Sequence, residues 1–144
     1  MIDQKFLGKK YPASTYEIGK EKVKEYARAV GDFNPLYLDD GKAKASKYGG
    51  IIAPPTFAVV YAREPVGHML FDNDLALNIP MLVHGEQEFE FYKVVRPGDV
   101  ITTEGEIGEI YDKKGKDFIS MITTSRNQKG DMVCKGKWTF VIRS

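Results

Sequence analysis

The chain has very few of the residues that build disulfide, redox or metal sites. Its 144 residues include one cysteine, Cys134, and two histidines. A single cysteine excludes an intrachain disulfide, and no group of cysteines and histidines has the spacing of metal ligands. We therefore expect no metal and no cofactor, and the cysteine usage favours a reducing cytoplasm as the location.

A long apolar run and a charge excess are also missing. No stretch approaches the roughly 18 apolar residues of a membrane helix, and the first residues, Met-Ile-Asp-Gln-Lys, lack the apolar core of a signal peptide. We expect a soluble, unprocessed protein that does not enter a membrane. The 21 Lys and Arg nearly balance the 20 Asp and Glu, so a nucleic-acid partner is not expected. Hydrophobic residues make up 42%, which suffices for one domain over residues 1–144.

The first half of the sequence has helical patterns. Between residues 20 and 30 apolar side chains recur at i, i+3, i+4 and i+7, which predicts a short amphipathic helix that ends at Gly31. Residues 40–48 can form a second one. After a double proline, residues 56–62 are apolar on nearly every face, which indicates a fully buried helix. Pro65 predicts that this helix bends or ends nearby.

The second half changes to the period of two that is typical of strands. Residues 86–91 alternate between glutamate and large or amide side chains, and further strands are predicted at 100–111, 118–126 and 134–142. Helices followed by antiparallel strands predict an α+β domain with one wide sheet that needs a cover. The apolar helix at 56–62 is the natural cover.

One hexapeptide carries the functional information. The segment Asp32-Phe-Asn34-Pro35-Leu-Tyr37 follows the first predicted helix, and Pro35 keeps Asn34 out of helical geometry, so a defined loop can point polar side chains into a pocket. Five residues further on comes Ala43. This pattern resembles the hydratase 2 signature of the MaoC-like (R)-specific enoyl hydratases and dehydratases.

The resemblance implies a hotdog fold, in which an antiparallel sheet wraps a long central helix and two subunits pair edge to edge. In that family an Asp and a His handle water and the C2 proton of an acyl thioester. Asp32 matches the Asp, Asn34 would orient it or the water, and Tyr37 occupies the His position. A phenol has a pKa of about 10, against about 6.5 for imidazole, so it is a poor base near pH 7. Structural roles, Asp32 in a turn and Tyr37 as a packed aromatic, remain the alternatives.

The segment Ile52-Ala53-Pro54-Pro55 is the second place where the sequence differs from the pattern of the active hydratases. The resemblance places Pro55 where the family has a glycine whose backbone N–H stabilises the thioester oxygen, and proline has no N–H. The Thr56 amide or hydroxyl is a possible substitute, and we assign Pro55, Thr56 and Phe57 to the substrate-binding site. Losing an oxyanion donor costs roughly 10² to 10³ in rate, and losing a general acid or base about 10² to 10⁴.

Three functions follow as hypotheses. The resemblance favours the FAS1-like, MaoC N-terminal branch, with its HadA-type subunits, which lack the His and hold the acyl chain for a catalytic MaoC-like partner. The first hypothesis is therefore the substrate-binding subunit of a (3R)-hydroxyacyl-CoA or acyl-carrier-protein (ACP) dehydratase in fatty acid metabolism, as a heterodimer or homodimer. The second is a self-sufficient homodimeric enoyl-CoA hydratase or thioesterase that uses Asp32 with Tyr37 or His84. The third is a non-catalytic acyl-CoA binding module.

Overall fold

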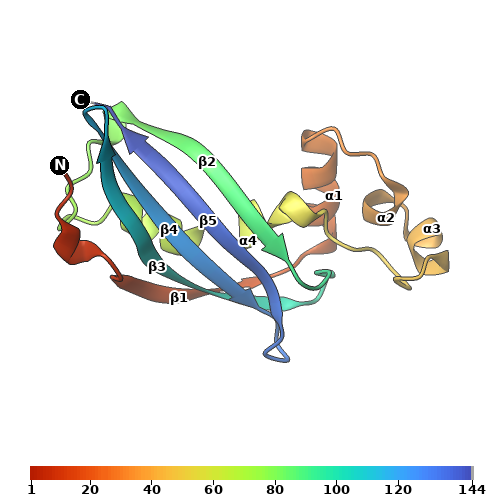
Figure 1. Cartoon of the computed structure of the whole chain (residues 1–144). Coiled ribbons are helices and arrows are strands. Elements are labelled where there is room, and N and C mark those ends of the chain that lie inside the picture. Colours follow the sequence, from red (N-terminus) through yellow and green to blue (C-terminus); the bar gives the residue numbers. More distant parts are fainter. Residues whose placement is uncertain (144) are drawn as a thin grey trace.

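The computed structural model describes residues 1–143 and contains one five-stranded antiparallel sheet with helices on one face and at one end (Figure 1). The strands are β1 (Lys10–Glu17), β2 (Leu82–Phe91), β3 (Val100–Lys113), β4 (Lys116–Arg126) and β5 (Met132–Ile142), in the spatial order β1-β3-β4-β5-β2. The predicted α+β class and the four predicted strands are confirmed.

The strand β1 is the one that the sequence pattern did not predict. It contains Pro12 and has a register irregularity between Tyr11 and Ser14. Proline cannot donate to a strand ladder and is confined to edge strands and bulges. Because β1 lies at the end of the sheet and, among residues 1–143, pairs with β3 alone, it tolerates both features.

Three short helices lie beyond one end of the sheet: α1 (Lys20–Ala29), α2 (Pro35–Leu38) and α3 (Asp40–Ala45) (Figure 1). The first confirms its prediction. The predicted loop after Asn34 is instead one turn of helix. Asn34 itself stays out of helical geometry, as expected, and its side-chain oxygen accepts a 3.0 Å hydrogen bond from the Leu36 amide, which caps the turn. The third is shorter than predicted, since Ser46 leaves helical geometry.

The predicted long central helix is divided into η2 (Pro55–Phe57), α4 (Ala58–Tyr61) and α5 (Glu64–Leu70). The bend comes one turn earlier than predicted. Pro65 has no N–H to donate to the carbonyl of Tyr61, four residues before it. The hydroxyl of Thr103 in β3 donates to that carbonyl instead, at 3.4 Å. The chain thus bends where the sheet satisfies the freed oxygen.

The core lies between this divided helix and the sheet. Its fully buried side chains include Phe57, Met69, Ile101 and Met121, and α5 packs across β1, β3 and β4. Two single turns complete the elements, η1 (Gln4–Phe6) before β1 and η3 (Ile79–Met81) before β2. None of the helices in the described residues has the length and apolar character needed to cross a membrane.

Candidate functional site

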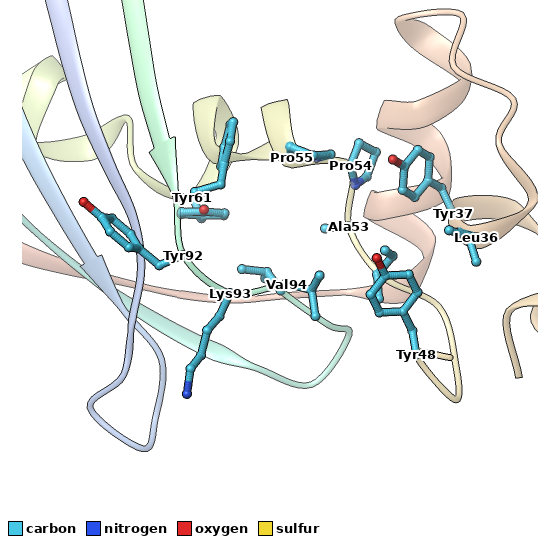
Figure 2. A pocket seen from close by; sticks show the side chains of 13 residues that line it. Leu36, Tyr37, Tyr48, Ala53, Pro54, Pro55, Tyr61, Tyr92, Lys93 and Val94 are labelled. Atoms are coloured by element: carbon cyan, nitrogen blue, oxygen red, sulfur yellow. The ribbon is translucent and has the colours of Figure 1, made fainter. Parts of the chain in front are cut away.

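A cavity of about 320 Å³ lies between the three helices at the end of the molecule and the chain that leaves β2 (Figure 2). Its wall comes from α2 and the loop after α3, from the start of the divided helix, and from the end of β2 with the residues that follow. The thirteen lining residues are Leu36, Tyr37, Tyr48, Ile52, Ala53, Pro54, Pro55, Tyr61, Phe91, Tyr92, Lys93, Val94 and Val95.

Tyr37 is part of this wall. Its side chain is only 8% exposed and packs in a small cluster with Ala27 and Ile52. Burial raises the pKa of its phenol, and the nearby carboxylate of Asp32 and the Tyr48 side chain raise it further. The phenol therefore keeps its proton at neutral pH, so Tyr37 can donate a hydrogen bond but cannot act as a base there.

The other two residues predicted to be catalytic lie beside Tyr37, outside the cavity wall. Asp32 and Asn34 are both exposed. The Asp32 carboxylate accepts a hydrogen bond from the Asn34 amide at 3.2 Å, and the Asn34 side chain caps α2. Both side chains thus shape the turn that presents Tyr37, which is the structural alternative considered for Asp32. Their catalytic roles stay predictions.

Of the three residues assigned to substrate binding, only Pro55 lines the cavity. Thr56 is exposed, and the hydroxyl of Tyr26 lies 3.0 Å from its Oγ1 and 3.1 Å from its carbonyl oxygen. Phe57 is fully buried in the core, edge-on to Tyr26 with 5.3 Å between ring centroids. The helix start thus offers the cavity two proline rings, and the binding roles of all three residues remain untested.

Sequence reasoning missed most of the aromatic wall. Tyr48 follows α3 in a segment that the pattern assigned to a helix. Tyr61 lies in the predicted apolar helix, and Tyr92 follows the strand predicted over residues 86–91. The position of Tyr48 is fixed by Arg96, whose guanidinium donates to the Tyr48 carbonyl oxygen. The Arg96 amide in turn donates to Asp99 at 2.8 Å. The contact between Arg96 and Tyr48 joins residues 48 apart in the chain, so no local pattern could have revealed it.

The remaining candidate groups lie elsewhere or are unreactive. His84 does not line the cavity and stacks on Phe140 with 4.8 Å between ring centroids. Cys134 is 2% exposed, and burial raises the pKa of its thiol to about 11, which disfavours the reactive thiolate. Within residues 1–143, no three or more His, Cys, Asp or Glu side chains are grouped so that they could hold a metal ion.

An antiparallel sheet with a helix across one face defines a hotdog fold, which solved hydratase and dehydratase structures share. Residues 5–136 match the family described as FAS1-like, dehydratase domain region, and the chain belongs to this family. The predicted membership of the FAS1-like branch is thereby confirmed.

Two curated relatives span nearly the whole chain. A UPF0336 protein from Saccharopolyspora erythraea is 37% identical over 143 residues, covering 99% of this chain and 92% of the relative. A UPF0336 protein from Streptomyces avermitilis is 37% identical over 144 residues, covering 99% and 96%. Neither name states an activity. These relatives therefore show common ancestry, and the function has to be inferred from the site.

Solved structures share the fold. A MaoC-like dehydratase superimposes with a TM-score of 0.83 at 27% identity, covering 96% of this chain and 42% of that one. The HadBC (3R-hydroxyacyl-ACP dehydratase) complex from Mycobacterium tuberculosis superimposes with a TM-score of 0.82 at 24% identity, covering 94% of this chain and 96% of that one. The ChsH1-ChsH2 complex from the same organism superimposes with a TM-score of 0.74 at 21% identity, covering 93% of this chain and 84% of that one. The last two likenesses concern the fold alone, and two-chain complexes occur among these neighbours.

Proposed function

We propose that this protein is the substrate-binding subunit of a (3R)-hydroxyacyl thioester dehydratase, and that a MaoC-like partner supplies the Asp and His that perform the chemistry. The substrate is an acyl-CoA or acyl-ACP thioester. The observation that carries the proposal is the cavity wall itself. A protonated phenol stands where the catalytic MaoC-like hydratases have their base, and a proline stands where those hydratases have their backbone donor.

Both replacements act against autonomous catalysis. Without an acceptor at position 37, the proton at C2 of the substrate has no base within the cavity, a loss of about 10² to 10⁴ in rate. Pro55 cannot donate to the thioester oxygen, a further loss of roughly 10² to 10³. The cavity keeps its apolar wall, which is what holding an acyl group requires.

The outer edge of β2 is the surface that we assign to the partner. Within residues 1–143, β2 pairs with β5 alone, so one backbone edge of this ten-residue strand has no ladder partner. Phe91 at its end is 48% exposed and also lines the cavity. A long, unblocked edge strand is a template for pairing with another chain. Pairing there would bring the partner next to the cavity mouth.

The test compares this chain alone, its MaoC-like partner alone and the two together. The partner is a chain with an intact Asp-x-Asn-Pro-x-His, sought first beside this gene. The assay substrates are crotonyl-CoA and longer trans-2-enoyl-CoA thioesters. Their hydration is measured as the decrease in enoyl absorbance. We expect the pair to exceed this chain alone by at least about 10³. An Asp32→Asn variant of this chain keeps the oxygen that accepts from the Asn34 amide, so it should support the pair as well as the natural chain does.

The other outcomes separate the remaining functions. Full hydration by this chain alone, lost in Asp32→Ala, would contradict the subunit role and favour a self-sufficient homodimer. Acyl-CoA hydrolysis by this chain alone, lost in the same variant, would favour a thioesterase. Tight acyl-CoA binding with no turnover, even with the partner present, would favour a binding module.

A further inference from the structure

We propose that the cavity is selective for thioesters whose acyl group ends in an aromatic ring that carries an oxygen, and that the Tyr37 and Tyr48 hydroxyls bind this oxygen. The inference rests on the proposed function, because it names the acyl group that the same cavity holds. A 3-arylacryloyl thioester with an oxygenated ring has the required shape and chemistry.

The first observation is the composition of the wall. Aromatic side chains make up five of its thirteen residues, namely Tyr37, Tyr48, Tyr61, Phe91 and Tyr92. The flat faces of such rings favour another ring, in stacked or edge-to-face contacts worth about 0.5 to 1.5 kcal/mol each beyond burial. A straight alkyl chain gains only the burial. The wall therefore discriminates between acyl groups of similar size by their shape.

The second observation is a pair of phenols without partners. Tyr37 comes from α2 and Tyr48 from the loop after α3, and the hydroxyls of both point toward the cavity (Figure 2). In the described part of the chain, no hydrogen bond engages either hydroxyl, whereas Tyr26, Tyr11 and Tyr92 all have one. Two hydroxyls that point into the cavity without a protein partner favour a ligand with a polar atom between them.

The backbone segments that carry the two phenols are also held in place before a ligand arrives. The backbone around Tyr48 is fixed at its carbonyl by the Arg96 guanidinium and at its amide by the Ser46 hydroxyl, at 3.2 Å. The Tyr37 amide donates to the Asn34 carbonyl at 3.0 Å. Preorganised groups lose less freedom on binding, so their hydrogen bonds contribute more to affinity and selectivity.

The volume of the cavity fits an acyl group that ends in an aromatic ring. At about 320 Å³, it lies at the lower end of the range of about 300 to 1,000 Å³ for small-molecule sites. A single ring with a short linker suits such a volume, whereas most of a long acyl chain would extend outside it.

The experiment measures binding of three thioesters to the full chain by calorimetry: 4-hydroxycinnamoyl-CoA, cinnamoyl-CoA and trans-2-octenoyl-CoA. We expect both aryl ligands to bind at least about ten times more tightly than the octenoyl ligand. Tyr37→Phe and Tyr48→Phe should each weaken 4-hydroxycinnamoyl-CoA about two- to tenfold and leave cinnamoyl-CoA unchanged. Tyr111→Phe is the matched control, because Tyr111 stacks on Phe118 away from the cavity. It should change no affinity.

Each contrary result has one meaning. Octenoyl-CoA binding as tightly as the aryl ligands would overturn the selectivity and leave the proposed function standing. Equal losses for both aryl ligands in Tyr37→Phe and Tyr48→Phe, or no loss for either, would overturn the role of the two hydroxyls. Failure of all three thioesters to bind, with and without the partner, would reject the proposed function itself.

Discussion

The side chain at position 37 shows how one residue can change the chemistry of a site while its neighbours keep its geometry. Asp32 and Asn34 accept backbone hydrogen bonds that build the turn and start α2. Those bonds would be the same with an imidazole or a phenol at position 37. The buried phenol beside a carboxylate keeps its proton, so this site has exchanged a proton acceptor for a hydrogen-bond donor.

The buried thiol of Cys134 makes stability depend on pH. Burial raises its pKa from 9.0 to about 11, so the folded chain keeps a proton that the unfolded chain has lost. This contribution to stability is complete below pH 9 and is lost as the pH rises toward 11. We expect the free energy of unfolding to fall between these pH values by about 2 kcal/mol more than in Cys134→Ala, measured by urea denaturation.

The same variant provides its own control at pH 8, where the thiol is protonated in both states. At pH 8 the difference in unfolding free energy between the natural chain and Cys134→Ala therefore measures only the packing that the variant loses. Parallel stability curves for the two proteins from pH 8 to 11 would show that the thiol titrates normally in the fold.

At the level of single residues, the sequence predicted the residues of the motif but missed most of the aromatic residues of the cavity wall. Tyr37 and Pro55 could be identified because they interrupt a known local pattern, and both line the cavity. Tyr48 and Arg96 could not, because their contact depends on how α3 and the chain after β2 meet in space. Local patterns report turns and faces, whereas a cavity wall is a product of tertiary packing.

At the scale of elements, the close approach of α5 to the sheet depends on a glycine. A Cβ atom at Gly105 in β3 would lie 2.6 Å from the Pro65 Cβ and 2.9 Å from the sulfur of Met121. We expect Gly105→Ala to lower the free energy of unfolding by about 1 to 3 kcal/mol, because the core would be overpacked. Thermal or urea denaturation measures this change.

Gly67 in α5 offers the matched control. A Cβ there meets no atom within 4 Å, and alanine is the better helix former by about 1 kcal/mol. Gly67→Ala should therefore stabilise the protein by a few tenths to about 1 kcal/mol. Stabilisation by both variants would mean that α5 can shift away from the sheet without loss.

A polar contact ties β1 to the chain after α5. The Tyr11 hydroxyl donates to the Asp72 carboxylate at 2.7 Å, and the Lys9 ammonium lies 2.6 Å from the same oxygen. The Asp72 side chain is 11% exposed, and the hydrogen bonds from Lys9 and Tyr11 lower its pKa. We expect Tyr11→Phe to cost about 1 to 2 kcal/mol of stability at pH 7, measured by urea denaturation.

The pH dependence of that loss identifies its cause. A lowered pKa means that the contribution of Asp72 is present above its ordinary value of 3.8 and is lost as the pH falls below it. The cost of Tyr11→Phe should therefore shrink near pH 3. A cost that is the same at pH 3 and pH 7 would point to packing of the ring and not to the carboxylate.

The elements also show where pattern and structure diverge. The hairpin between β3 and β4 joins two strands that the sequence predicted, and its Lys114 and Gly115 take the two positive φ angles, 55° and 71°, of a tight two-residue turn. The strand β1 was not, since Pro12 contradicts a strand unless the strand is known to lie at an edge. The position of the helix bend likewise depended on Thr103, a residue of a distant strand.

Across the whole molecule, the two edges of the sheet differ in a way that bears on assembly. The β1 edge carries Pro12 and a bulge, two features that discourage strand pairing. The β2 edge has its irregularity between His84 and Glu86, after which the strand continues in regular register to Phe91. An incoming chain would therefore find a continuous backbone template only on β2, beside the cavity.

Hydrogen exchange tests this assignment. When the MaoC-like partner is added, we expect the outward-facing amides between Glu86 and Phe91 to exchange at least about tenfold more slowly, because they would enter a ladder of backbone hydrogen bonds. Amides of β1 should not change, and they serve as the internal control. Slower exchange on β1 with none on β2 would place the partner at the opposite edge, far along the sheet from the aromatic cavity, and would remove the geometric link between assembly and substrate binding.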